Sequence, residues 1–384
     1  MTPQGSGWQE VFLGNSADAE ERLHDFDDEI HAIQFDAAGT GNLVPRCFHA
    51  KTQLSARGVF SVAEDVPEDL RIGFFQPGAE FPADVRISNG SVNIRADVVP
   101  DLRGIAVRVY TGDQGSPNLL SGETATYQDY LGINTPSAFS SFGYAFVGLM
   151  RSFHASHRPD LLERLLVEPA AKLPPVGRPL TLPDYLRLPD AVRRVRRFAH
   201  YLREVEPAPE RPWKTAIGII KTLSRRISRP PASLAGETYW GQAPFKWGPL
   251  AVEYKFKPRD FVGRKRGSGE GYLAEDLRER VKAGPIRFDF LLARFVDEER
   301  TPIEDAAKQW DSEYVRVADL VILQSPSVDD EAGRRAREEI DTIEFSPWNA
   351  TDDFRPLGSL NRSRKRVYQA SAAMRDTICP AGFD

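Results

Sequence analysis

GVFSVAE at 58–64, DVRISNG at 84–90 and GIAVRVY at 104–110 are three short runs in which apolar and polar side chains alternate. Glycine, proline and aspartate lie between these runs, as they do in the turns that join neighbouring strands. A strand with this alternation buries one of its faces. Residues 42–110 therefore predict a set of antiparallel strands.

Two later runs predict further strands, PLAVEYKFKP at 249–258 and PIRFDFLLARFV at 285–296. Helical spacing of apolar residues follows in IEDAAKQW at 303–310 and in DDEAGRRAREEI at 329–340. Strands and helices thus come in blocks, without strict alternation along the chain. This order favours an α+β fold, in which helices surround a closed antiparallel β-barrel.

The composition is that of a globular protein. With 384 residues, 41% of them hydrophobic, the chain can bury a large core in one big domain or two ordinary ones. Its net charge of −5 gives no case for nucleic-acid binding. The first ten residues, MTPQGSGWQE, lack the basic and apolar regions of a signal peptide, and no stretch approaches the ~20 apolar residues of a membrane span. We therefore expect a cytoplasmic protein.

Cysteine and histidine do not predict a metal site of their own. Cys47 and Cys379 are the only two cysteines, too few for a disulfide framework, and we expect buried thiols. The six histidines include no HExxH motif, and the pair His154 and His157 is a weak signal. A zinc enzyme is not expected.

The segment 190–229 is strongly basic, with eleven Lys or Arg against four Asp or Glu. Apolar residues from Val192 to Leu202 recur at helical intervals, which predicts an amphipathic basic helix. The simpler interpretation is a helix with one face on the core, and the functional one is attraction to anionic lipid or an acidic partner. We assign a helical arm to 1–40, a main domain to 41–384 and a basic helical insertion to about 155–235.

NRSRKRVYQASAAMR, residues 361–375, places one tyrosine between two arginines. Arg364 precedes Tyr368 by four residues and Arg375 follows it by seven, so a helix presents all three on one face. Spacing alone favours a solvated basic helix, because an arginine four residues before a tyrosine often occurs by accident. Other parts of the chain decide between these interpretations.

Ordered blocks from about Val44 to Arg375 make the chain resemble the haem catalases and their shorter catalase-related relatives. Any one block is weak, but all occur in the family's order. They are RCFHAK (46–51), VRISNG (85–90), DLRGIAVRVY (101–110), INTP (133–136), TPIEDA (301–306) with the later Trp310, SPWN (346–349) and FRPLGSLNRSRKRVY (354–368).

The resemblance implies a cofactor, haem b, and a role for each matching residue. Tyr368 would bind the ferric iron as a phenolate, with Arg364 one helical turn away as a stabilising cation. On the other face of the haem, His49 would move the proton of the peroxide, while Ser88 would fix the tautomer of the His49 imidazole. Further matches are three arginines that would pair with the haem propionates and an aromatic residue on the haem approach, namely Arg46, Arg86, Arg375 and Phe146.

Two departures from the family bear on activity. Large catalases carry a distal asparagine where this chain has Ile133, and Asn134 follows one residue later. Asn134 serves as the distal amide only if the chain shifts register by one residue. Phe48, directly before His49, makes the expected pocket more apolar and better suited to organic or fatty hydroperoxides.

The sequence thus favours a haem enzyme acting on hydroperoxides, either a catalase-related peroxidase or an isomerase similar to allene oxide synthase. A true catalase stays open if Asn134 replaces the missing amide. A third hypothesis is a haem- or lipid-binding module with little turnover, held at membranes through 190–229. A homo-oligomer is left open as well.

Overall fold

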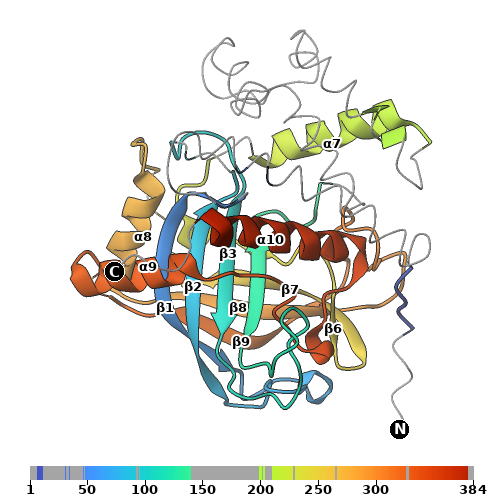
Figure 1. The fold of residues 1–384 in the computed structure, drawn as a ribbon, viewed down its shortest axis with the longest axis horizontal. Coiled ribbons are helices and arrows are strands. Elements are labelled where there is room, and N and C mark those ends of the chain that lie inside the picture. Colours follow the sequence, from blue (N-terminus) through green and yellow to red (C-terminus); the bar gives the residue numbers. More distant parts are fainter. Residues whose placement is uncertain are drawn as a thin grey trace.

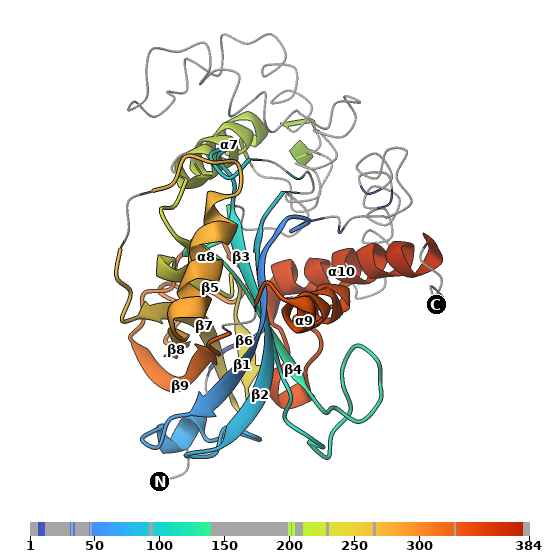
Figure 2. The ribbon, with the colours of Figure 1, turned by 90° about the vertical axis from the view of Figure 1, so that its left-hand side faces the viewer.

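An antiparallel β-barrel forms the centre of the molecule (Figures 1 and 2). Neighbouring strands follow the order β5-β4-β3-β2-β1-β9-β8-β7, and a pairing of β5 with β7 closes the ring of eight, while β6 pairs with β7 beside it. The α+β barrel expected from the sequence is confirmed. The computed structural model describes residues 7–11, 31, 34, 46, 48–91, 94, 96–139, 199–200, 202–203, 210–227, 230–263, 266–325 and 328–378.

The strands and helices have the following bounds. The strands are β1 Thr52–Val62, β2 Glu80–Asn89, β3 Arg103–Val109, β4 Gln128–Ile133, β5 Tyr239–Trp240, β6 Phe245–Trp247, β7 Leu250–Arg259, β8 Ile286–Arg294 and β9 Tyr314–Ile322. The helices are α7 Pro212–Ile227, α8 Tyr272–Ala283, α9 Glu331–Thr342 and α10 Gly358–Ile378, with short 3₁₀ turns η1 Glu68–Leu70, η2 Leu234–Gly236 and η3 Asp352–Phe354.

Aromatic side chains fill the barrel interior. Phe60 on β1 and Phe290 on β8 are fully buried, with ring centroids 5.3 Å apart in an edge-to-face arrangement. Burying each such ring contributes about 1.5–3 kcal/mol. Tyr254 on β7 also donates from Oη to the carbonyl of Leu131 (2.8 Å) and accepts from its amide (2.9 Å). The barrel core is therefore tied directly to β4, a strand of the functional site.

Helices α9 and α10 lie on one side of the barrel in both views, and α8 lies on another side (Figure 2). Two distant carboxylates satisfy the first amides of α10: Glu10 accepts from Gly358 N (3.0 Å) and Glu304 from Ser359 N (2.7 Å). Gly358 has φ +81°, and a Cβ there would collide with the carbonyl of Ile303. These contacts fix where α10 begins, and so where its side chains point.

The helix expected over 303–310 is wrong, because these residues form turns. The carbonyl of Ala306 accepts from Ala138 N and that of Ala307 from Ser137 Oγ, both at 2.9 Å. Carbonyl groups that a helix would use internally are engaged here in tertiary contacts. By contrast, the helix expected over 329–340 is present as α9, and the strands expected from 58–64, 84–90, 104–110, 249–258 and 285–296 are all present.

Much of the basic segment lies outside the described residues, as do most of the expected arm at 1–40 and insertion at about 155–235. The amphipathic helix expected from Val192 to Leu202 also lies mostly outside the described residues. The described helix α7, farther along the same segment, buries Ala216 and Ile219 and exposes Lys214 and Lys221. Among the described residues, no helix combines the length and apolar character that crossing a bilayer requires.

Candidate active site

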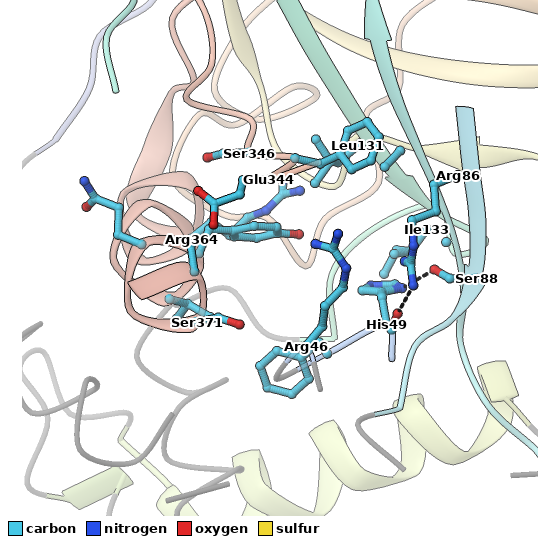
Figure 3. Close-up of a pocket in the computed structure, with 18 of the residues that line it drawn as sticks. Arg46, His49, Arg86, Ser88, Leu131, Ile133, Glu344, Ser346, Arg364 and Ser371 are labelled. Atoms are coloured by element: carbon cyan, nitrogen blue, oxygen red, sulfur yellow. Dashed lines mark hydrogen bonds between the residues drawn. The ribbon is translucent and has the colours of Figure 1, made fainter. Parts of the chain in front are cut away.

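A cavity of about 350 Å³ lies between α10 and the ends of β2, β3 and β4 (Figure 3). In Figure 3, Arg364 and Ser371 project from α10 on one side, while His49, Ser88 and Ile133 stand on the other. The segment that follows α9 closes a further edge, where Glu344 and Ser346 lie. Strands from the first half of the chain and its last long helix thus build one site.

The strand register explains which residues face the cavity. Ser88, Gly104 and Ile133 form one cross-strand row over β2, β3 and β4. Two residues along, the next row is Arg86, Ala106 and Leu131. All six line the cavity, because every second residue of a strand points to the same face.

His49 stands at this wall, directly before β1. Its Nδ1 lies 3.1 Å from Ser88 Oγ. The imidazole covers Gly104, where an added Cβ would come within 2.5 Å of His49 Cε1. Ser88 therefore fixes one ring nitrogen, and no described residue hydrogen-bonds the other, Nε2.

The imidazole of His49 is neutral at ordinary pH. The pKa of His49 is lowered to about 3, mainly because the imidazole is buried. Three guanidiniums act on that pKa in the same direction, those of Arg86, Arg364 and Arg46. A neutral imidazole can accept a proton, so His49 is equipped to act as a base.

Tyr368 projects from α10 and lines the same cavity. The guanidinium carbon of Arg364 lies 5.9 Å from the Tyr368 ring centroid, as their spacing predicts. Arg364 is itself held by the carbonyl of Gly241 and by Asn361 Oδ1, each at 3.1 Å. Among the described residues, nothing hydrogen-bonds the Tyr368 hydroxyl, which leaves its oxygen available to a ligand in the cavity.

Two of the three arginines expected at haem propionates lie at the cavity edge, near the end of α9. Arg46 donates to the carbonyls of Asp341 (2.6 Å) and Ile343 (2.7 Å). Arg86 donates to Asp341 Oδ1 at 3.1 Å. The backbone of Arg375 belongs to α10, while its side chain and Phe146 lie outside the described part of the structure.

Asn134 is the one expected site residue that the structure describes away from the cavity. It follows Ile133, whose side chain lines the wall, and the shift of register that Asn134 would need does not occur. Instead, Asn134 Oδ1 accepts from Arg103 N (2.8 Å) and its Nδ2 donates to Glu237 (2.9 Å). The cavity wall therefore carries an isoleucine where an amide was expected.

Comparisons with known proteins agree with this geometry. No protein-family profile matches the chain. A catalase-related peroxidase from Mycolicibacterium paratuberculosis (strain ATCC BAA-968 / K-10) is 27% identical over 366 residues, which cover 92% of this chain and 95% of that protein. A solved bacterial catalase superposes with a TM-score of 0.55 at 20% identity, over 99% of this chain and 66% of that one. The chain is therefore similar to a catalase-related peroxidase over most of its length, and it has the fold of the solved bacterial catalase.

Other solved catalases give the same result. Catalase A from Saccharomyces cerevisiae has a TM-score of 0.57 at 18% identity, over 97% of this chain and 67% of that one. A fungal catalase matches with a TM-score of 0.57 at 17% identity, over 97% of this chain and 65% of that one. The chain thus spans about two thirds of the length of those catalases but nearly all of the shorter peroxidase.

Several residues of the cavity wall were not expected from the sequence. They are Gly104, Leu120, Leu131, Gln242, Glu344, Phe345, Ser346 and Val367. Gly104 had a usable signal, because a glycine within a predicted strand often marks a close approach of another group. Ser346 and Val367 lie in the blocks SPWN and FRPLGSLNRSRKRVY, which assigned them no role, and the others come from segments with no motif of their own.

We expect Gly104→Ala to displace the His49 imidazole. A Cβ at residue 104 would lie 2.5 Å from Cε1 and 2.6 Å from Nδ1, so the ring must move away from Ser88. An error of about 1 Å in a catalytic group costs about 100-fold in rate. Steady-state kinetics should show that loss, and Gly132→Ala, a substitution in the neighbouring strand, serves as a comparison because its Cβ would meet Tyr239 rather than His49. An unchanged rate in Gly104→Ala would contradict the placement of the ring.

Proposed function

We propose that the chain is a haem-dependent peroxidase that reduces hydroperoxides with electrons from an outside donor. The observation that carries this proposal is that Tyr368 on α10 and His49 before β1 line one cavity, together with the guanidiniums of three arginines, Arg46, Arg86 and Arg364. A phenol that no described residue hydrogen-bonds, apolar walls and several cations suit a flat, dianionic macrocycle with an iron at its centre.

Four residues would hold the cofactor. Tyr368 would bind iron through its phenolate oxygen, a form that the cation of Arg364 favours. Arg46 and Arg375 would pair with the propionates, because guanidinium groups bind carboxylates with two parallel hydrogen bonds. When bound, haem b supplies a redox-active iron that exchanges electrons with the peroxide.

His49 would move the proton of the hydroperoxide. Its neutral imidazole accepts that proton at Nε2, while Ser88 holds Nδ1 and so sets the tautomer. The same proton is then returned to the departing oxygen, which leaves as an alcohol or as water. Gly104 gives the ring a flat surface to rest on and keeps it in this orientation.

Ile133 favours a peroxidase over a true catalase. A catalase must orient a second hydrogen peroxide as its reductant, for which a polar donor beside the histidine is useful. Here Ile133 occupies that wall and Asn134 is bonded elsewhere. A small organic donor that reacts at the cavity edge does not need this amide. The relative named as a catalase-related peroxidase supports the same choice.

One set of assays tests the proposed function. The purified protein should show the absorption spectrum of ferric haem, and hydroperoxide should oxidise an added dye with little release of oxygen. Absence of haem would contradict the proposal outright. Rapid oxygen evolution without a donor would identify a true catalase instead. Rearrangement of a fatty-acid hydroperoxide, with both oxygens kept in the product, would identify an isomerase similar to allene oxide synthase.

A further inference from the structure

The backbone of His49 adopts an unusual conformation. Its φ is +60°, in the left-handed region that residues with a side chain seldom occupy. Such conformations persist where surrounding contacts enforce them, and they gather at functional sites. Two hydrogen bonds hold its backbone: His49 N donates to Gly90 O (3.0 Å), and the carbonyl of His49 accepts from Arg86 Nη2 (2.7 Å).

Arg86 is held in turn by its other contacts. Its Nη2 also donates to Thr52 Oγ1 (2.8 Å), and its Nε donates to Asp341 Oδ1 (3.1 Å). The side chain of Arg86 is only 5% exposed, whereas that of Asp341 is 40% exposed. The bonds from Arg86 to His49 and Thr52 are therefore better shielded from water than its bond to Asp341. Figure 3 shows Arg86 and Ser88 next to each other beside His49.

Asp341 connects this cluster to α9. Its Oδ1 accepts from Thr52 Oγ1 (3.0 Å) and Ser55 Oγ (2.8 Å) on β1 as well as from Arg86 on β2. One carboxylate oxygen therefore joins two strands at the position where β1 begins. The register of β1 against β2 also shifts there, between Thr52 and Leu54, so ladder hydrogen bonds alone do not fix this end of the strand.

We propose that Asp341 is a positioning residue that holds the backbone of His49 in its left-handed conformation through Arg86. The carboxylate fixes the guanidinium, the guanidinium fixes the carbonyl of His49, and the imidazole is thereby set against Gly104 and Ser88. Arg86 thus serves the distal histidine in addition to any anion at the cavity edge. The catalytic consequence rests on the proposed function, whereas the backbone consequence does not.

Hydrogen exchange tests the backbone consequence in the purified full-length chain. In Asp341→Ala, we expect the amides of His49 and Ala50, bonded to Gly90 O and Ser91 O, to exchange about 10-fold faster, while peptides from β8 stay unchanged. Asp341→Asn keeps an oxygen acceptor and should lie between this variant and the wild type. The matched control is Glu338→Gln, an exposed acidic residue of α9 without an ion pair to any described residue.

The rate test separates positioning from cofactor binding. Outer partners of a catalytic group typically contribute about 10–100-fold, so donor oxidation by Asp341→Ala should fall by that factor at unchanged haem content. Unchanged exchange at 49–50 would overturn the proposal, even in a fully active enzyme. Haem loss that accompanies the rate loss, with exchange unchanged, would assign the Asp341 and Arg86 pair to cofactor binding and overturn it too. A wild type without haem would contradict the proposed function alone.

Discussion

In the Tyr368→Phe variant, the affinity for haem is expected to fall by about 100-fold or more. The haem content and the peroxidase activity of the purified protein should fall with it. The substitution removes one oxygen atom and keeps the ring that packs beside Leu131 and Phe345. Iron would lose its protein ligand, whereas the apolar walls and the guanidiniums would remain. The haem-to-protein absorbance ratio after gel filtration measures this directly.

A second tyrosine provides the control for that variant. Tyr110 lies outside the cavity, and its hydroxyl donates to Asp84 Oδ2 at 2.7 Å. Tyr110→Phe therefore removes a phenolic hydroxyl at a distance from the site and should keep both haem and activity. Full haem retention and activity in Tyr368→Phe would show that another residue binds the iron.

His49→Gln is expected to slow hydroperoxide reduction by about 10²- to 10⁴-fold, the usual contribution of a positioned acid or base. Glutamine keeps a polar side chain of similar reach but cannot take up a proton. Haem content should stay at the wild-type value, because His49 stands on the wall opposite α10. Stopped-flow measurement of the peroxide step gives the rate, and the absorption spectrum gives the haem content.

The pH dependence of the same step tests the environment of His49. Because the pKa of His49 is lowered to about 3, the neutral imidazole persists as pH falls from 8 to about 4. Protonation removes the base only below that range, so the acid limit assigned to His49 should lie near its lowered pKa. The wild-type rate of the peroxide step should therefore show no fall around pH 6.5. If the rate did fall with a midpoint near pH 6.5, and if this fall disappeared in His49→Gln, His49 would be well solvated.

The sequence predicted the strands in which apolar and polar side chains alternate, and the helix whose motif is formed by residues close together in the sequence. In strands β1, β2 and β3, apolar and polar side chains alternate over part of the length. Helix α10 carries Arg364 one turn before Tyr368. Strand β4 was not predicted, because five consecutive residues from Gln128 to Gly132 are buried and leave no alternation to detect. The turns at 303–310 show the opposite error, since a helical pattern there lost to tertiary hydrogen bonds.

The candidate site divides in the same way. His49, Ser88, Arg364 and Tyr368 each lie in a motif, and the structure brings them to one cavity. The direction of the Asn134 side chain depends on the register of β4 against β3. No sequence motif predicts that register. Asp341 is farther from prediction still, because it meets Arg86 only after α9 has packed on β1 and β2.

Locating the iron tests the central claim most directly. Crystals of the purified protein should give one anomalous peak at the iron absorption edge, at bonding distance from Tyr368 Oη and on the side that faces His49. An iron peak bound by any other residue would contradict the account. So would a haem-loaded crystal in which the Tyr368 hydroxyl points away from the metal.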